Sequence, residues 1–254
     1  MHNTNKMSRG DDMIEMLIGS FISAISTGLG AVPVLFFKEL SHKWRDILLA
    51  YSAGIMMAAT SFGLIPQSLS ESNMWILVTG VLCGTVLLTI LEKVIPHQDV
   101  EQVDSFQPNF DAKAKLVILA LCFHNIPEGF SVGVSYTSAS QDLGNLIALS
   151  IGLQNAPEGL IVALFLLGTN VGRLKAVLIA TLTGMIEILA GVIGFLLAHS
   201  IGFFVGFGLA FAAGAMLFIV YKELIPESHG HGYERVATYG FVFGILTMLY
   251  IMNL

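Results

Sequence analysis

The sequence predicts an all-helical (all-α) membrane protein with eight transmembrane helices. Its 254 residues are 55% hydrophobic and only 12% charged, and the mean hydropathy of +0.77 is too high for a soluble domain. Apolar stretches of roughly twenty residues, long enough to cross about 30 Å of hydrocarbon as helices, recur along the whole chain. They cover residues 14–37, 47–70, 72–92, 114–136, 143–169, 174–198, 200–221 and 233–254. We therefore expect residues 1–254 to form a single polytopic domain surrounded by the lipid bilayer.

The basic residues indicate how these segments are oriented. Lys6 and Arg9 precede the first segment, and the other ten of the 12 Lys and Arg residues lie at or beside the first, third, fifth and seventh connections. Cytoplasmic connections are rich in basic residues, so we expect both termini to be extracytoplasmic in a plasma (inner) membrane. The first segment is too long for the apolar region of a signal peptide and is predicted to be a transmembrane helix. Nothing in the composition favours nucleic-acid binding.

The connections and the cysteines suggest little further chemistry. Residues 96–111 are the longest connection and are predicted to be a solvated cytoplasmic loop. The seventh connection contains His229 and His231, a local pair that is compatible with weak metal contact. Cys83 and Cys122 lie inside apolar segments, which indicates that they act as small hydrophobic side chains and form no disulfide.

An internal repeat relates the second segment to the seventh. Residues 50–68 align without gaps on residues 210–228, and both copies contain Ala-Gly-x-Met followed by Leu-Ile-Pro. The predicted topology makes the two copies run in opposite directions, which is the pattern of an inverted repeat. With three helices in each half and two between them (3+2+3), the fourth and fifth segments lie at the centre. Inverted-repeat transporters bind substrate there, near the midplane of the membrane.

The two central segments carry near copies of one motif. The first is His-Asn-Ile-Pro-Glu-Gly at residues 124–129, and the second is Gln-Asn-Ala-Pro-Glu-Gly at residues 154–159. Residues four apart share one face of a helix, so His124 lies one turn from Glu128, and the second motif repeats this arrangement. The prolines release backbone carbonyl oxygens, and the glycines allow close packing of helices. Two such faces together predict a cage for a cation between helices 4 and 5.

Three buried carboxylates need neutralisation. Of the 18 acidic residues, Glu128, Glu158 and Glu187 lie near the centre of a segment, and no Lys or Arg lies at that depth. A carboxylate there costs about 2.5–3.5 kcal/mol, so each must be protonated or bind a cation. Protonation alone does not explain the imidazole and amides grouped with them. Together these groups suit a divalent zinc, iron, manganese or cadmium ion.

Several polar residues have two interpretations on sequence alone. Asn125, Gln154 and Asn155 are either metal ligands or hydrogen-bonding residues between helices. Glu223, at the end of the seventh segment, is either a snorkelling partner of Lys222 or part of an exit gate.

These motifs resemble those of the ZIP (Zrt/Irt-like) family of divalent-metal transporters and look most similar to its prokaryotic GufA-like branch. The resemblance covers nearly the whole chain. It implies inward transport of Zn²⁺ and other divalent metals by an elevator-like slide of helices 4 and 5, with no prosthetic group. It also implies a binuclear site. One metal would be held by Met56, His124, Glu128, Gln154 and Glu158. The other would be held by Asn125, Asn155 and Glu187, with Glu128 and Glu158 bridging.

The resemblance also changes the interpretation of single residues. It raises Met56 from a predicted core residue to a ligand, and it places Glu223 on the cytoplasmic release route. Asn155 stands where related members carry Asp, which should weaken or alter the second metal position. Lys222 replaces a His, so a third metal site on the cytoplasmic side is not expected.

Two other function classes fit parts of the pattern. An intramembrane metal-dependent hydrolase would use a metal at this depth to activate water, but the sequence has no His-Glu-x-x-His motif and no obvious general base, so we predict no enzyme. A proton-coupled carrier of an organic substrate needs the carboxylates but not the imidazole and amides. Faces of small residues could serve a homodimer or internal packing equally well.

Overall fold

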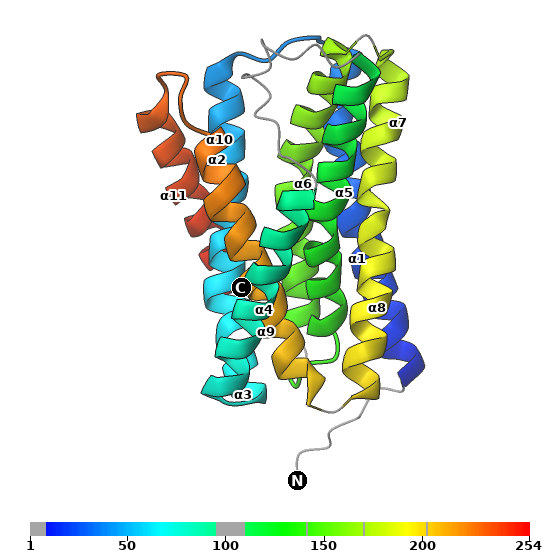
Figure 1. The fold of residues 1–254 in the computed structure, drawn as a ribbon, viewed down its shortest axis with the longest axis vertical. Coiled ribbons are helices and arrows are strands. Elements are labelled where there is room, and N and C mark those ends of the chain that lie inside the picture. Colours follow the sequence, from blue (N-terminus) through cyan, green and yellow to red (C-terminus); the bar gives the residue numbers. More distant parts are fainter. Residues whose placement is uncertain (1–8, 95–109, 141, 170, 202) are drawn as a thin grey trace.

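The structure is a computed structural model that describes residues 9–94, 110–140, 142–169, 171–201 and 203–254 (Figure 1). Within these ranges the regular elements are helices, and no strand occurs. The α-helices are α1 (Arg9–Ala31), α2 (His42–Ala58), α3 (Ile65–Glu71), α4 (Met74–Val94), α5 (Phe110–Ser135), α6 (Leu143–Gly168), α7 (Arg173–Gly184), α8 (Ile186–Ser200), α9 (Phe204–Ile219), α10 (Ile225–Glu227) and α11 (Glu234–Ile251). The predicted loop at residues 96–111 lies outside the described residues except for its last two, which belong to α5.

Helices occupy each of the eight predicted segments, either singly or as consecutive pieces. Among the described residues, six stretches are long and apolar enough to cross a membrane. They are Gly10–Leu35, His42–Glu71, Met74–Lys93, Leu143–Gly168, Arg173–Ser200 and Phe204–Glu227. The chain is therefore an all-helical protein with several candidate membrane spans, and the count of eight stays a prediction.

The two copies of the internal repeat have the same local conformation. A π-helical segment, Ala59–Leu64, separates α2 from α3, and a second one, Val220–Leu224, separates α9 from α10. Each ends directly before an Ile-Pro pair. Proline lacks an N–H, and its ring crowds the carbonyl one turn earlier, which widens the helix locally. In Figure 1, α2 runs down to α3 while α9 runs up to α10, so the two copies are antiparallel.

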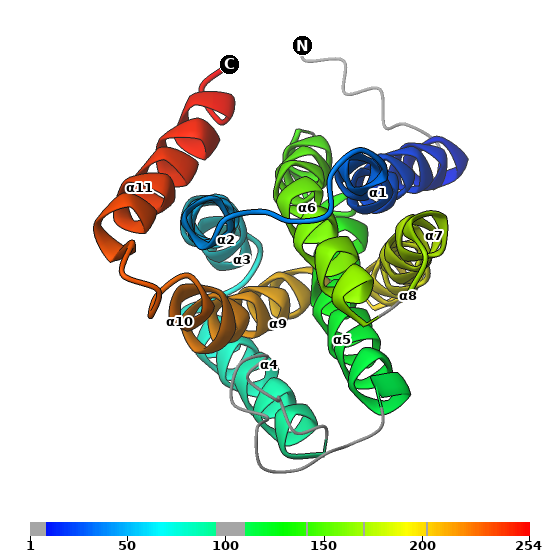
Figure 2. The ribbon, with the colours of Figure 1, turned by 90° about the horizontal axis from the view of Figure 1, so that it is seen from above.

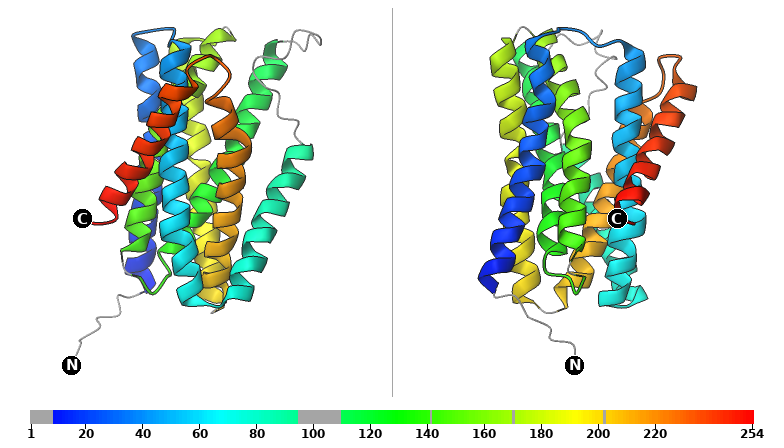
Figure 3. Two further views of the ribbon diagram at one scale, coloured as in Figure 1. Left: turned by 90° about the vertical axis from the view of Figure 1, so that its left-hand side faces the viewer. Right: turned by 180° about the vertical axis from the view of Figure 1, so that it is seen from behind.

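The helices form two groups when the molecule is seen from above (Figure 2). One group contains α1, α5, α6, α7 and α8, and the other contains α2, α3, α4, α9, α10 and α11. Figure 3 shows α11 leaning along α2 at the outer edge of the second group. A hydrophobic core lies where the groups meet, and it includes Met56 and Met216 from the repeat together with Val132 and Ile151 from α5 and α6.

Close helix contacts within the first group depend on the motif glycines. A Cβ atom at Gly129 would overlap the backbone of Glu187 on α8, and a Cβ at Gly159 would overlap the carbonyl oxygen of Thr27 on α1. Only glycine permits these approaches. The predicted packing role of both glycines is confirmed, and it brings α1, α5, α6 and α8 together around the motif side chains.

Candidate functional site

The first part of the site lies between α5 and α6. The side-chain amide of Gln154 donates a hydrogen bond to Oε1 of Glu128, which links the two helices. Glu128 and Gln154 are fully buried, and Glu158 is 7% exposed. Glu128 Oε2, Gln154 Oε1 and Glu158 Oε1 have no hydrogen-bond partner among the described residues. Because buried polar atoms are nearly always paired, three unpaired oxygens contributed by neighbouring turns of α5 and α6 favour a cation-binding position.

The second part is a polar triangle of α1, α6 and α8. The Ser23 hydroxyl donates to Oε2 of Glu187, and Asn155 Nδ2 donates to Glu187 Oε1 at 2.6 Å. The amide oxygen of Asn155 is buried and has no partner among the described residues. Glu187 lies in the first turn of α8, because the sixth predicted segment is interrupted at Met185. A helix N-terminus favours a carboxylate, and this adds to the two hydrogen bonds.

Asn125 is directed to a backbone group. Its Nδ2 donates to the carbonyl oxygen of Thr183 at 2.8 Å, close to the break before α8. This is the interhelical hydrogen-bonding role that the sequence left open, and the side-chain oxygen keeps its acceptor capacity for a cation.

The side chain of His124 contacts Glu223 of the second repeat copy. His124 and Glu128 are one helical turn apart on α5, as predicted, but His124 Nε2 lies 3.0 Å from Glu223 Oε2. Both residues line a cavity between α4, α5 and the second π-helical segment. Lys222 contacts Glu92 at 3.5 Å and does not pair with Glu223. Of the two interpretations that the sequence left open for Glu223, the structure does not form the snorkelling pair with Lys222, and each of the two residues instead contacts a neighbouring helix.

Met56 is fully buried in the hydrophobic core between the two groups. This position agrees with the packing role that its sequence context predicts. Its further role as a thioether ligand, which only the family resemblance implies, stays a prediction.

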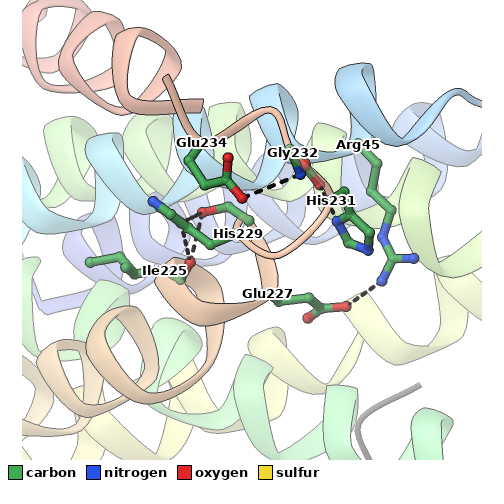
Figure 4. Close-up of polar contacts among 9 residues, drawn as sticks. Arg45, Ile225, Glu227, His229, His231, Gly232 and Glu234 are labelled. Atoms are coloured by element: carbon green, nitrogen blue, oxygen red, sulfur yellow. Dashed lines mark hydrogen bonds and ion pairs between the residues drawn. The ribbon is translucent and has the colours of Figure 1, made fainter. Parts of the chain in front are cut away.

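The seventh connection is attached to the start of α2 (Figure 4). His231 Nδ1 lies 3.0 Å from Asp46 Oδ1, and the His231 ring stacks on His42 with 4.6 Å between ring centroids. Arg45 forms an ion pair with Glu227 at 2.7 Å. His229 contacts the carbonyl oxygen of Ile225, at 2.8 Å. The two histidines therefore have different surroundings, and the structure does not bring them together as a pair.

The electrostatics of the site are dominated by acids. Asp46, Glu128, Glu158 and Glu187 are buried, whereas no Lys or Arg side chain is buried in the described part of the chain. The described residues contain no group of three or more His, Cys, Asp or Glu side chains that could hold a metal by themselves. A cation here would instead require the mixture of carboxylate and amide oxygens that surrounds Glu128 and Glu187.

Three residues of these networks, Ser23, His42 and Asp46, carry no functional signal in the sequence that we recognised. Ser23 was one of several serines in the first segment, and only the fold brings it to Glu187. His42 and Asp46 are four residues apart at the start of α2, a spacing that puts them on one helix face. That spacing was visible in the sequence, but their partner His231 is 185 residues from Asp46.

Comparisons with known proteins give the family. A model of the ZIP zinc transporter family matches residues 92–252. Zinc transporter GufA of Myxococcus xanthus is 36% identical over 245 residues, which cover 92% of this chain and 96% of that protein. Zinc transporter ZIPB of Bordetella bronchiseptica is 32% identical over 259 residues, covering 92% of this chain and 79% of that protein. Zinc transporter ZupT of Corynebacterium aurimucosum is 30% identical, with 89% and 92% covered. The chain thus belongs to the ZIP zinc transporter family.

Proposed function

We propose that this chain carries divalent transition-metal cations, with Zn²⁺ foremost and Fe²⁺, Mn²⁺ and Cd²⁺ as further candidates, across a membrane into the cytoplasm. Its family is one of transporters and not of enzymes, and the relatives above are named for zinc. The observation that carries the proposal is the set of buried, unpaired oxygens of Glu128, Gln154 and Glu158. Burying unpaired carboxylates is costly, and a bound divalent cation offsets that cost.

The proposed site holds two ions. The first position uses Glu128, Gln154 and Glu158, with Met56 and His124 as further ligands. The second position uses Asn125, Asn155 and Glu187, with Glu128 and Glu158 bridging the two ions. Two divalent ions would nearly discharge the three glutamates, which supports this arrangement.

His124 connects the first position to the release route in this proposal. Its contact with Glu223 extends a chain of metal-binding side chains from Glu128 towards the cavity beside α4. An ion that leaves the first position would keep His124 as a ligand and would gain Glu223, which contacts His124, as its next ligand. His231 lies further out, against Asp46, and His229 has only local contacts, so His231 is the better candidate of the two for the outer part of the route.

In this proposal the chain crosses the plasma membrane with eight helices. Both termini are extracytoplasmic, and the connections that carry the basic residues are cytoplasmic. The antiparallel repeat copies support an inverted-repeat architecture. The two helix groups support an elevator-like motion in which α1, α5, α6, α7 and α8 slide as a unit along the others. The site residues His124 to Glu187 all belong to that unit, whereas Met56 and Glu223 belong to the other group and would contact the ion at different stages.

Uptake of zinc by proteoliposomes tests this proposal. We expect the wild-type chain to import Zn²⁺, and we expect a Glu128→Gln, Glu158→Gln variant to lose nearly all uptake because its oxygens no longer carry the charge that compensates the cation. Glu39→Gln, at an exposed position outside the site, is the matched control and should import normally. Wild-type rates in the double variant would refute the proposal. Competition with iron, manganese and cadmium in the same assay ranks the substrates.

A further inference from the structure

Ser23 contacts both of the residues that distinguish the second half of the site. Its hydroxyl donates to Glu187 Oε2. Its backbone carbonyl accepts from Asn155 Nδ2 at 3.3 Å, and the same Nδ2 donates to Glu187 Oε1 at 2.6 Å. Ser23 is fully buried. It lies outside the two motifs and outside residues 92–252, the part that the family model matches.

These contacts fix the orientation of two side chains at once. The Asn155 amide group is held by the Ser23 carbonyl and by Glu187, so its oxygen points away from them and stays without a hydrogen bond. Each oxygen of Glu187 accepts one of the two hydrogen bonds described above. A carboxylate oxygen can accept about two such bonds, so each keeps a direction in which a cation can bind.

The α1 backbone is well placed to hold Ser23 rigidly. One turn further along α1, the Thr27 carbonyl meets Gly159 of α6 so closely that a Cβ atom would not fit. A Cβ at Gly30 would likewise overlap the backbone of Ala156, and a Cβ at Gly184 would overlap the carbonyl oxygen of Ala24. Helix α1 therefore keeps direct backbone contact with α6 and α7 on the side of the triangle.

We propose that Ser23 is a positioning residue of the second metal position, which it organises through Glu187 and Asn155. This inference rests on the proposed function and deepens it, because it concerns how the same site binds its ion. The Ser23 hydroxyl sets the angle of the Glu187 carboxylate, and its carbonyl sets the direction of the Asn155 oxygen. Residues that orient metal ligands in this way commonly change affinity by about 10-fold or more when they are replaced.

Kinetics of zinc uptake by Ser23 variants test the inference. Removing the hydroxyl in Ser23→Ala leaves Glu187 with one donor, so we expect the KM for Zn²⁺ to rise about 10-fold while Vmax falls much less. Ser23→Thr keeps a hydroxyl and should recover most of the affinity. Ser20→Ala is the matched control. Ser20 is equally buried one turn earlier on α1, and its hydroxyl contacts Met16 and not the site.

A double-mutant cycle separates positioning from packing. In a Glu187→Gln background the hydroxyl has no carboxylate to orient, so adding Ser23→Ala should change KM by less than about twofold. Full additivity of the two changes would show that Ser23 acts through packing alone and would overturn the inference. If Ser23→Ala does not fold, Ser23→Cys, with its weaker donor, carries the same test with a smaller expected rise in KM.

The proposed role of Ser23 and the proposed transport function can fail separately, and the experiments tell the two failures apart. If the wild type imports zinc and needs Glu128 and Glu158, but Ser23→Ala equals wild type in KM and in Zn²⁺ affinity measured on the purified protein, only the inference fails. If the wild type imports no divalent metal, the proposed function fails and this inference with it.

Discussion

At the scale of single residues, the glycine that ends each motif determines how near the site helices can come. Gly159 of α6 meets the Thr27 carbonyl of α1, and Gly168, the last residue of the same helix, has nothing within 4 Å of its Cβ position. One glycine is therefore required by its neighbour, and the other is not.

We predict that Gly159→Ala destabilises the protein by about 1–3 kcal/mol, because α1 and α6 must separate to admit the methyl group. Gly168→Ala should change stability by less than about 1 kcal/mol, since the added carbon has free space. Thermal unfolding of both variants in the same detergent measures the difference. Equal unfolding temperatures would show that the close contact with Thr27 does not constrain the helices.

Protons should compete with the metal at the buried carboxylates. Metal binding requires deprotonated ligands, so lowering the external pH from about 7.5 to about 5.5 should slow Zn²⁺ uptake by raising its KM. The measurement is initial uptake into proteoliposomes with the membrane potential clamped. Uptake that stays constant or accelerates on acidification would contradict competition at these residues.

The sequence predicted the residues of the motifs better than it predicted their partners. The burial of Glu128, Glu158 and Glu187 follows from the depth of each in an apolar segment, and the structure places all three in the interior. The contact of His124 with Glu223 and that of Ser23 with Glu187 join residues far apart in the chain, so no local spacing indicates them. Only the packing of the helices determines these pairs.

At the scale of the helices, the positions where helices break or end differ from those that hydropathy predicts. The sixth predicted segment reads as one continuous apolar stretch, but it contains the break at Met185 that puts Glu187 at the start of α8. The seventh predicted segment ends at residue 221, but in the structure the helix continues through the π-helical segment and α10 as far as Glu227. The distribution of apolar residues indicates which segments are buried, but it does not indicate where the backbone of a helix breaks or ends. Both features were therefore absent from the prediction.

The seventh connection offers a test at this scale. We predict that His231→Ala lowers stability by about 1–3 kcal/mol, because Asp46 is fully buried and loses its hydrogen bond from the ring. His229→Ala is the control within the same connection. His229 is exposed, and its hydrogen bonds within the described residues are local, to Ser228 and Ile225, so its loss should have little effect. Thermal unfolding of the two variants decides, and a larger loss for His229→Ala would contradict the assigned contacts.

At the scale of the whole molecule, the helices lie in two groups, and the motion we propose is a slide of one group along the other. Contacts inside each group bring backbones together at glycines, whereas side chains form much of the core between the groups. The sequence indicated the repeat and the central place of the fourth and fifth segments, but the division into groups became apparent only from the helix packing.

Cross-linking tests whether the groups move relative to each other. Glu71 of α3 accepts a hydrogen bond from the backbone of Ala139, which follows α5, so this pair joins the two groups. With Cys83 and Cys122 replaced by Ser, a short bifunctional thiol reagent on Glu71→Cys and Ala139→Cys should stop Zn²⁺ uptake. The same reagent on Tyr136→Cys and Asn145→Cys, a pair within one group, should not. Full uptake by the first tethered variant would exclude a sliding motion.

We propose that a divalent cation compensates the buried glutamates between α5 and α6. Anomalous X-ray scattering from crystals of the wild-type chain soaked in zinc tests it most directly. The predicted result is a peak at the zinc absorption edge within coordination distance of Glu128, Gln154 and Glu158, which disappears in the Glu128→Gln, Glu158→Gln variant. Well-diffracting zinc-soaked crystals with no anomalous peak among these three residues would contradict the account.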